Sequence, residues 1–503
     1  MKSRTLMLIA AMTLLAALAI PSPLAAQKPV KHHHYKLIDL GTFGGPNSGN
    51  NSPSVIISNE GAVTGVADTS IPDPYAPNCF GDCFVQHAFE WRNGVLIDLG
   101  SLPGGSSSYT NAINSHDQIV GQSQNGLIDP LTGIPEFVAA VWQDGRVIDL
   151  GTFGGGFSLA TANNNRQQVV GCAFNDVPDP FTPTGVFYGI FGLGPQQLRA
   201  FRWQGKQLQD LGTLGGPDAC AVWVNDRGQI AGASFTNSDV NPATSLPTLD
   251  PFLWEHGRML DLGTLGGTLG FAFIINNQGQ VAGQSNLAGD VDAHAFLWER
   301  GTLTDLGTLG GTFSTPIWLN EAGDVVGGAF TPMDQLFHAF LWRNGVIRDL
   351  GTLEGDCSSV ALALNSEGQI VGQSSSTCDF STARAVLWEK GGPALDLNRL
   401  VNPGSGLQLT EPKIINDRGE IVAVGLLPNG DVHSIVLIPC DENHGDSECE
   451  DDGGATVVAT QRISAPATQP ADATQGRLTP EMLAALRVRF ARRYRGFGAW
   501  PRN

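Results

Sequence analysis

The 503-residue chain has few charged residues, and their signs are unbalanced. Only 15% of residues are charged, and 48 acidic side chains against 29 basic ones give a formal net charge of -19. Sequence-independent binding to nucleic acid depends on Lys and Arg that neutralise phosphates. We therefore expect no nucleic-acid partner. After residue 26 no apolar run approaches the roughly 20 residues that a membrane-spanning helix needs. We therefore expect no transmembrane segment once the N-terminus is removed.

Several catalytic and cofactor-binding motifs are also missing. Gly-x-Ser-x-Gly is absent, and the many Gly-Gly pairs are not followed by the helix pattern and Lys of a phosphate loop. The Cys spacings lack the second ligand pair of a zinc site. The acidic stretch 440–452 does not fit the EF-hand pattern, although it leaves calcium as an alternative. We predict no catalytic residues, no metal, no cofactor and no enzymatic activity.

The N-terminus has the features of a secretory signal peptide. Lys2 and Arg4 precede an apolar run from Leu6 to Ile20, and small residues follow at Ala25 and Ala26. A retained N-terminal anchor is the alternative. Export predicts a secreted, extracellular or periplasmic protein.

A seven-residue cassette, Asp-Leu-Gly-Thr-Leu-Gly-Gly, recurs along the chain in near-copies, with a basic spacing of about 44 residues and insertions between some copies. Such a period indicates a solenoid, a propeller or another repeat array. Eight equivalent carboxylates spread round an array cannot converge on one metal, so we expect each Asp to cap the turn that follows it. The cassette Asp residues are Asp39, Asp98, Asp149, Asp210, Asp261, Asp305, Asp349 and the degenerate Asp396.

The unit from Thr312 to Gly355 reads as four short strands. Apolar or β-prone segments alternate with turn signals, and Asn344-Gly345 is a strong hairpin signal because both positions tolerate positive φ. The expected strands are Pro316–Asn320, Asp324–Gly328, His338–Trp342 and Val346–Leu350. Four strands per unit indicate one propeller blade, and hence an all-β fold.

Two residue types mark equivalent positions in successive units. An Asn is expected in the first turn at Asn59, Asn114, Asn225, Asn276, Asn320, Asn365 and Asn416, with the third unit shifted around Asn164-Asn165. A Trp ends the third strand at Trp91, Trp142, Trp203, Trp254, Trp298, Trp342 and Trp388, and we interpret it as core between blades rather than as a ligand platform.

The two ends of the array are out of phase. A lone fourth strand, Tyr35–Leu40, begins it, and three strands without a fourth end it near Pro439. Pairing of the ends predicts eight blades and removes exposed edges. Seven blades with one unit outside is the alternative. We number the units 1 to 8 by their first three strands.

His338-Ala339-Phe340-Leu341-Trp342, followed by Asp349-Leu350-Gly351, resembles the bacterial extracellular HAF-repeat family, for which no function is established. The motif recurs at His87 and His294, and the resemblance covers about residues 35–439. Other residues replace the His in units 2, 3, 4 and 7, which weakens a ligand role for it. The replacements are Val138, Arg199, Asp250 and Arg384.

Long insertions follow the second strand in units 1 to 4. Alternating strand directions place them on one face with the Gly-rich connectors, and long loops on a rigid scaffold often carry function. They span Val66–Gln86, Gln122–Phe137, Ala173–Leu198 and Ala233–Leu249, and three contain Pro-Asp-Pro-like turns. Nearby aromatic residues predict a ligand surface over units 1 to 4, with packing of the loops as the alternative. These residues are Tyr75, Phe80, Phe181, Phe187, Tyr188 and Phe191.

The even number of cysteines suits disulfides in an exported chain. Local spacing suggests three pairs, Cys79 with Cys83, Cys357 with Cys378 and Cys440 with Cys449, and leaves Cys172 and Cys220.

Composition changes after Pro439. An acidic and Ala/Thr/Pro-rich linker precedes a basic amphipathic helix that Thr479 and Pro480 open, which could contact an anionic surface. The expected domains are a signal peptide at 1–26, a leader at 27–34, the propeller at 35–439, the linker at 440–478 and the helical tail at 479–503.

Three functions remain open at this stage. The first is a secreted binding scaffold for an unknown glycan, peptide or protein ligand. The second is a propeller glycan hydrolase or lyase, and the third is a structural cell-surface component tethered by the basic tail.

Overall fold

The computed structural model describes residues 34–50, 54–74, 83–130, 135–179, 196–242, 244, 246–401 and 406–440. The expected signal peptide, nearly all of the linker, and the tail lie outside these residues. The described residues form antiparallel strands and two short 3-10 helices, η1 (Pro332–Asp334) and η2 (Leu397–Arg399). None of the described helices is long and apolar enough to span a bilayer.

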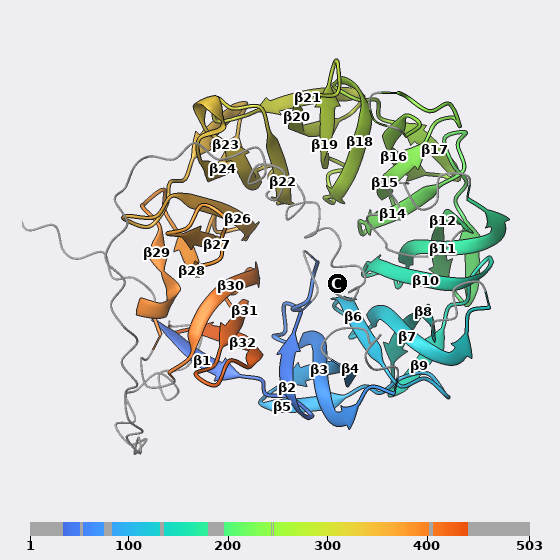
Figure 1. Cartoon of the computed structure of the whole chain (residues 1–503), viewed down its shortest axis with the longest axis horizontal. Helices are drawn as coiled ribbons and strands as arrows, with labels where there is room; N and C mark the ends of the chain where they lie inside the picture. The colour runs from blue at the N-terminus through green and yellow to red at the C-terminus, as the bar shows by residue number, and fades with distance from the viewer. Residues whose placement is uncertain are drawn as a thin grey trace, which may run out of the picture. The chain divides into compact units, whose positions relative to one another are not determined.

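Each repeat forms a four-stranded antiparallel group, and the groups follow one another around a central opening (Figure 1). Unit 1 comprises β2 (Gly44–Gly49), β3 (Val63–Pro72), β4 (Phe84–Arg92) and β5 (Val95–Asp98). Unit 2 comprises β6 (Ser108–Ile113), β7 (Ile119–Ile128), β8 (Pro135–Gln143) and β9 (Arg146–Asp149). Unit 3 comprises β10 (Gly154–Asn163), β11 (Val169–Pro178), β12 (Gln196–Gln204) and β13 (Gln207–Asp210). Unit 4 comprises β14 (Ala219–Val224), β15 (Ile230–Phe235), β16 (Leu249–Glu255) and β17 (Arg258–Asp261).

The later units repeat this order. Unit 5 comprises β18 (Gly266–Ile275), β19 (Val281–Leu287), β20 (Ala293–Glu299) and β21 (Thr302–Gly307). Unit 6 comprises β22 (Ser314–Leu319), β23 (Val325–Phe330), β24 (Phe337–Arg343) and β25 (Val346–Asp349). Unit 7 comprises β26 (Ser358–Leu364), β27 (Ile370–Ser375), β28 (Ala383–Trp388) and β29 (Leu395–Asp396). Unit 8 comprises β30 (Gln408–Ile415), β31 (Ile421–Leu426) and β32 (Val432–Pro439), beside β1 (Tyr35–Asp39).

The sheets show how the ends of the array are joined. β1 pairs antiparallel with β32, and Tyr35 lies opposite Pro439. Units 4 and 5 share one eight-stranded sheet, because a single parallel bridge joins Leu249 to Leu269. The other units are separate four-stranded sheets of the propeller type.

A repeated glycine allows the first two strands of a unit to approach closely. The first strand of unit 6 has a β-bulge between Pro316 and Trp318. A Cβ atom at Gly327 on the second strand would overlap the carbonyl oxygen of Thr315, so only Gly fits there. Phe340, which is fully buried, lies opposite this glycine on the third strand. At the equivalent Gly283 of unit 5, a Cβ atom would also overlap the ring of Phe296, so the Phe of the repeat motif packs where the glycine has no side chain.

The repeated Trp residues are core, as predicted. In unit 7, Trp388 is 1% exposed and lies opposite Ile370 on the second strand. The other six occupy the same register position, and Trp342 is the one of them that is only partly buried.

A turn asparagine hydrogen bonds to the next unit almost all the way round. The Oδ1 atom of Asn225 accepts from the backbone N–H groups of Arg227 and Gln229 and so closes its own turn. Its Nδ2 atom donates to the backbone oxygen of Asn276 in unit 5 at 2.9 Å. Equivalent inter-unit bonds run from Asn114 to Asn164, Asn164 to Asn225, Asn276 to Asn320, Asn365 to Asn416 and Asn416 to Ser58. The last of these joins unit 8 to unit 1.

This register corrects one sequence assignment. The equivalent residue in unit 1 is Ser58, not Asn59, because the Ser58 Oγ accepts from the N–H groups of Glu60 and Ala62. A serine hydroxyl accepts the same pair of bonds as an Asn oxygen. In unit 3 the equivalent residue is Asn164, while Asn165 accepts a bond from Ser115.

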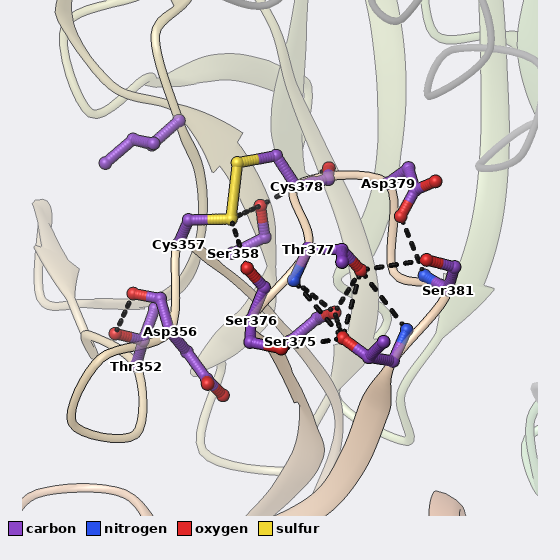
Figure 2. Close-up of a disulfide and its surroundings, with 12 residues drawn as sticks. Thr352, Asp356, Cys357, Ser358, Ser375, Ser376, Thr377, Cys378, Asp379 and Ser381 are labelled. Atoms are coloured by element: carbon purple, nitrogen blue, oxygen red, sulfur yellow. Dashed lines mark hydrogen bonds between the residues drawn. A yellow bond between two sulfur atoms is a disulfide. The ribbon is translucent and has the colours of Figure 1, made fainter. Parts of the chain in front are cut away.

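Two disulfides are present among the described residues. Cys172 on β11 pairs with Cys220 on β14, and this bond joins units 3 and 4 with a Cα–Cα distance of 5.0 Å. Cys357 pairs with Cys378, as the spacing predicts, and this bond ties the connector before β26 to the loop after β27. Hydroxyl groups of Ser375, Thr377 and Ser381 gather beside it (Figure 2). The pairs Cys79–Cys83 and Cys440–Cys449 stay predictions, because Cys79 and Cys449 lie outside the described residues.

The asparagine bonds predict a specific stability effect. Asn225→Ala removes a buried side chain that serves two units, so we expect a loss of about 2–4 kcal/mol in unfolding free energy. Asn429→Ala is the matched control, because Asn429 closes only its own exposed turn around Asp431. We expect the control to cost less than about 1 kcal/mol. Chemical denaturation measures both, and equal losses would show that the inter-unit bond adds nothing.

Candidate functional site

The His of the repeat motif pairs with the cassette Asp of the same unit. His338 Nδ1 lies 2.9 Å from Asp349 Oδ2, and the cassette carboxylate also accepts from the backbone N–H of Gly351. The same pairs join His87 to Asp98, His294 to Asp305 and His433 to Asp39. Capping of the following turn by the cassette Asp is therefore confirmed. Burial alone would raise the pKa of the Asp349 carboxyl group. The hydrogen bonds from His338 and Gly351 lower this pKa by more than burial raises it, so the net pKa is below its usual value.

Two units have Arg in place of this His, and the Arg forms an ion pair with the cassette Asp. Arg199 Nε lies 3.0 Å from Asp210, and Arg384 bonds to both Asp356 and Asp396. A nitrogen group opposite the cassette Asp is therefore shared by six units, and the His itself is not required.

Unit 4 has a carboxyl group where these units have a His or Arg side chain. Asp250 is 9% exposed and hydrogen bonds to the cassette residue Asp261. Burial raises the pKa of Asp250 to about 7, and the charge and hydrogen bond of Asp261 raise it as well. Near neutral pH this position therefore exchanges a proton.

A second buried carboxyl group lies on the same end of unit 4. Asp218, just before β14, is 2% exposed and accepts from the N–H of Leu198 at 2.7 Å. Burial raises the pKa of Asp218 to about 7, with a further contribution from Asp179. The Leu198 bond and Arg199 act in the opposite direction.

A cavity of about 590 Å³ lies in the central channel, on the face of the asparagine turns. The first strands of units 2 to 8 and the segment that follows β2 in unit 1 contribute to its walls. Its volume falls in the range usual for small-molecule sites. The connector face with the insertions is at the other end of these strands.

The channel wall is asymmetric two residues before the turn asparagine. This position holds Ala112 in unit 2 and Ala162 in unit 3, but Trp223 in unit 4 and Trp318 in unit 6. The two Trp rings meet edge to face, with centroids 5.6 Å apart. The cavity wall is therefore formed by small side chains at this position in units 2 and 3 and by large rings at the same position in units 4 and 6.

Two residues that line this cavity near the alanines each carry one buried polar side-chain atom. Ser54 Oγ in unit 1 and Asn163 Oδ1 in unit 3 are buried and have no hydrogen-bond partner in the described part of the chain. The Nδ2 atom of Asn163 donates to the backbone oxygen of Gln118, which fixes the amide orientation. Asn163 is the polar exception at a position that is Ile113, Val224 or Leu319 elsewhere.

Three carboxylates from different units line the channel on its turn face. Asp226, Glu321 and Asp417 each accept from a backbone N–H of the preceding unit, at 2.8 to 3.1 Å. They therefore strengthen the contacts between units and give this part of the cavity a negative charge.

All six aromatic residues of the predicted ligand surface lie outside the described residues, so that surface stays a prediction. They are Tyr75, Phe80, Phe181, Phe187, Tyr188 and Phe191. The described parts of the insertions show longer strands than expected, because β3, β7 and β11 each reach ten residues. Equivalent aliphatic residues near their ends are exposed at Ile71 (58%), Leu127 (60%) and Val177 (43%).

Sequence reasoning missed the channel site, although one signal for it was available. Trp223 and Trp318 stand outside the repeated Trp position. Seven Trp residues were interpreted as core because they share one repeated position. Trp223 and Trp318 do not share that position, and this difference could have indicated a separate role.

Comparisons with known proteins show similarity in fold. No protein-family profile and no curated protein matches the chain, so the HAF-repeat resemblance stays a prediction. The β-propeller domain of the Trilobed protease from Pyrococcus furiosus is similar at 9% identity and a TM-score of 0.40, over 71% of this chain and 97% of that one. Dipeptidyl peptidase 4 of Porphyromonas gingivalis gives 10% identity and 0.38, over 82% of this chain and 61% of that one. An α-L-arabinofuranosidase of Fusarium graminearum gives 8% identity and 0.28, over 81% and 97%.

These neighbours contradict one expectation. The lack of a recognisable catalytic motif predicted that the chain is not an enzyme, yet peptidases and a glycosidase stand among the structures similar to it. A fold of this kind does not exclude catalysis, and the exclusion was wrong. At this level of similarity the neighbours assign no activity to the chain.

The carboxyl pair of unit 4 predicts a distinct pH dependence of stability. Folded Asp250 holds its proton up to a pH of about 7, whereas an unfolded Asp releases it near pH 4. The folded chain therefore binds more protons between these values, and this group lowers stability as pH rises through them.

Asp250→His replaces the second carboxyl group by the His–Asp hydrogen bond seen in unit 6, and we expect it to gain on the order of 1 kcal/mol over the natural chain at pH 8. The gain should be smaller at pH 5. Asp250→Asn, which cannot ionise, should also lose this pH dependence. Thermal denaturation from pH 4 to 8 measures all three, and parallel curves would contradict the assignment.

Proposed function

We propose that the protein is an exported binding scaffold whose eight blades close into a ring and hold a small ligand in the central channel. Blade count and closure are supported by the pairing of β1 with β32 and by the bond from Asn416 to Ser58. Export is supported by the signal-like N-terminus and by two disulfides, which persist in oxidising compartments.

One observation supports binding in the channel more than any other. The position that holds Trp in units 4 and 6 holds Ala in units 2 and 3, near the buried oxygens of Ser54 and Asn163. These two oxygens have no hydrogen-bond partner among the described residues. Buried polar atoms normally have partners, since leaving one unpaired costs about 1–3 kcal/mol. We infer that a ligand with hydrogen-bond donors pairs with both atoms once the side chains that cover them shift, and ordered water is the competing explanation.

The binding proposal predicts that Ala162→Trp blocks the cavity. The fold already accepts Trp at this position in units 4 and 6, so the variant should fold. We expect calorimetry with a panel of saccharides, amino acids and nucleosides to find a binder, and Ala162→Trp to weaken it at least about tenfold. Val95→Trp on the exposed face of β5 is the control for added Trp.

Two outcomes would remove the channel site. Either no panel member binds at millimolar concentration, or the binder is unaffected by Ala162→Trp. If alanines at Phe187, Tyr188 and Phe191 abolish binding while thermal stability is kept, the ligand lies on the insertion face that the sequence predicts.

A hydrolase is the second candidate, and the unit 4 carboxyl groups favour it. A general acid must hold a proton near neutral pH, and Asp218 and Asp250 do so. We expect Asp250→Asn to lower any hydrolysis of glycan or peptide substrates at least about 100-fold, with the fold checked by circular dichroism. Unchanged hydrolysis in both Asp218→Asn and Asp250→Asn would exclude these residues as acids.

A further inference from the structure

The chemistry of the channel narrows the class of ligand beyond the proposed function, on which this step rests. The cavity combines an aromatic side, a small-residue side, neutral acceptors and a negative turn face. Each of these features favours or disfavours a particular kind of molecule.

The aromatic side favours a ligand with an apolar ring face. Trp223 and Trp318 are only partly buried, although most of the repeated Trp residues are buried core. Both rings line the cavity. A flat ring with C–H groups packs against such a surface through dispersion and burial of apolar area.

The opposite side requires hydrogen-bond donors without charge. Ser54 Oγ and Asn163 Oδ1 are neutral oxygens, and the nearby Ala112 and Ala162 carry no polar group. Hydroxyl groups suit such acceptors. A buried ammonium or guanidinium would lose its hydration there without a counter-charge among these four residues, which is costly.

The turn face disfavours anions. Asp226, Glu321 and Asp417 lie at the cavity on three different units, and the whole chain carries -19. Backbone N–H groups already bond to these carboxylates but do not cancel their charge. A carboxylated or phosphorylated ligand would meet like charge on entry.

We propose that the channel binds a neutral saccharide, with its ring against Trp223 and Trp318 and its hydroxyl groups donating to Ser54 and Asn163. A ring with an apolar face and several uncharged donors meets all of these conditions. The cavity of about 590 Å³ is large enough for a ligand of more than one sugar ring.

The test compares four probes on the full chain by calorimetry: glucose, maltose, glucuronate and glycine betaine. We expect glucose or maltose to bind saturably, and glucuronate to bind at least about tenfold more weakly because of the three carboxylates. Glycine betaine tests the alternative that the Trp pair recognises a quaternary ammonium.

Two variants test the hydrogen bonds. Ser54→Ala removes only the hydroxyl oxygen, and Asn163→Leu installs the residue found at the same position in Leu319 and Leu364. Each should weaken the sugar about 3- to 10-fold, as expected for one neutral hydrogen bond. Chemical denaturation checks the fold, because Asn163→Leu also removes the bond to Gln118.

The outcomes separate this inference from the proposed function. If glucuronate or glycine betaine binds as tightly as the sugars and Ala162→Trp abolishes that binding, the channel site stands and the saccharide class is wrong. Sugar binding that is indifferent to Ser54→Ala and Asn163→Leu also overturns the saccharide assignment. If no probe or panel member binds in an Ala162→Trp-sensitive way, both proposals fail, and water satisfies the two oxygens.

Discussion

The structure depends on one side chain that does two things at once. The turn asparagine of a unit closes its own turn through Oδ1 and reaches the next unit through Nδ2, as Asn225 does toward Asn276. In the units that have both bonds, one side chain therefore stabilises the turn and the interface. The residues that follow add a second set of contacts, in which the N–H of Asn165 donates to Asp226. These bonds lie beside the channel and fix the positions of the strands that line it.

The repeat motif is explained by contacts within and between units. In unit 6, His338 holds the cassette Asp349, and the N–H of Ala339 donates to Ser359 of unit 7. Phe340 lies opposite the repeated Gly327, and Trp342 lies opposite Val325 near the end of the strand. With these residues committed to the scaffold, variation is left to the insertions, the channel wall and the exceptional carboxyl groups of unit 4. Each of the proposed sites falls at a departure from the repeat.

The sequence allowed strands to be predicted well and the site poorly, for a physical reason. The expected strand His338–Trp342 is β24 (Phe337–Arg343), because turn residues limit a short strand at both ends. Asn59 was misassigned because Ser58 accepts the same two backbone bonds, which residue identity does not reveal. Strict alternation along a strand could not predict the channel wall, because a bulge in the first strands of units 2 to 8 shifts the inward face by one residue. The unpaired oxygens of Ser54 and Asn163 depend on neighbours far away in sequence.

The acceptor of each asparagine bond between units is a main-chain carbonyl, which every amino acid supplies. A unit therefore recognises its neighbour through the backbone and does not need a matching side chain across that contact. Duplication or loss of a whole repeat in the gene would leave this contact intact at the new junction. Recombination can thus change the number of repeats, while point mutations alter single channel positions such as Ala162 and Trp223. The number of repeats and the residues of the channel wall can therefore change independently of each other.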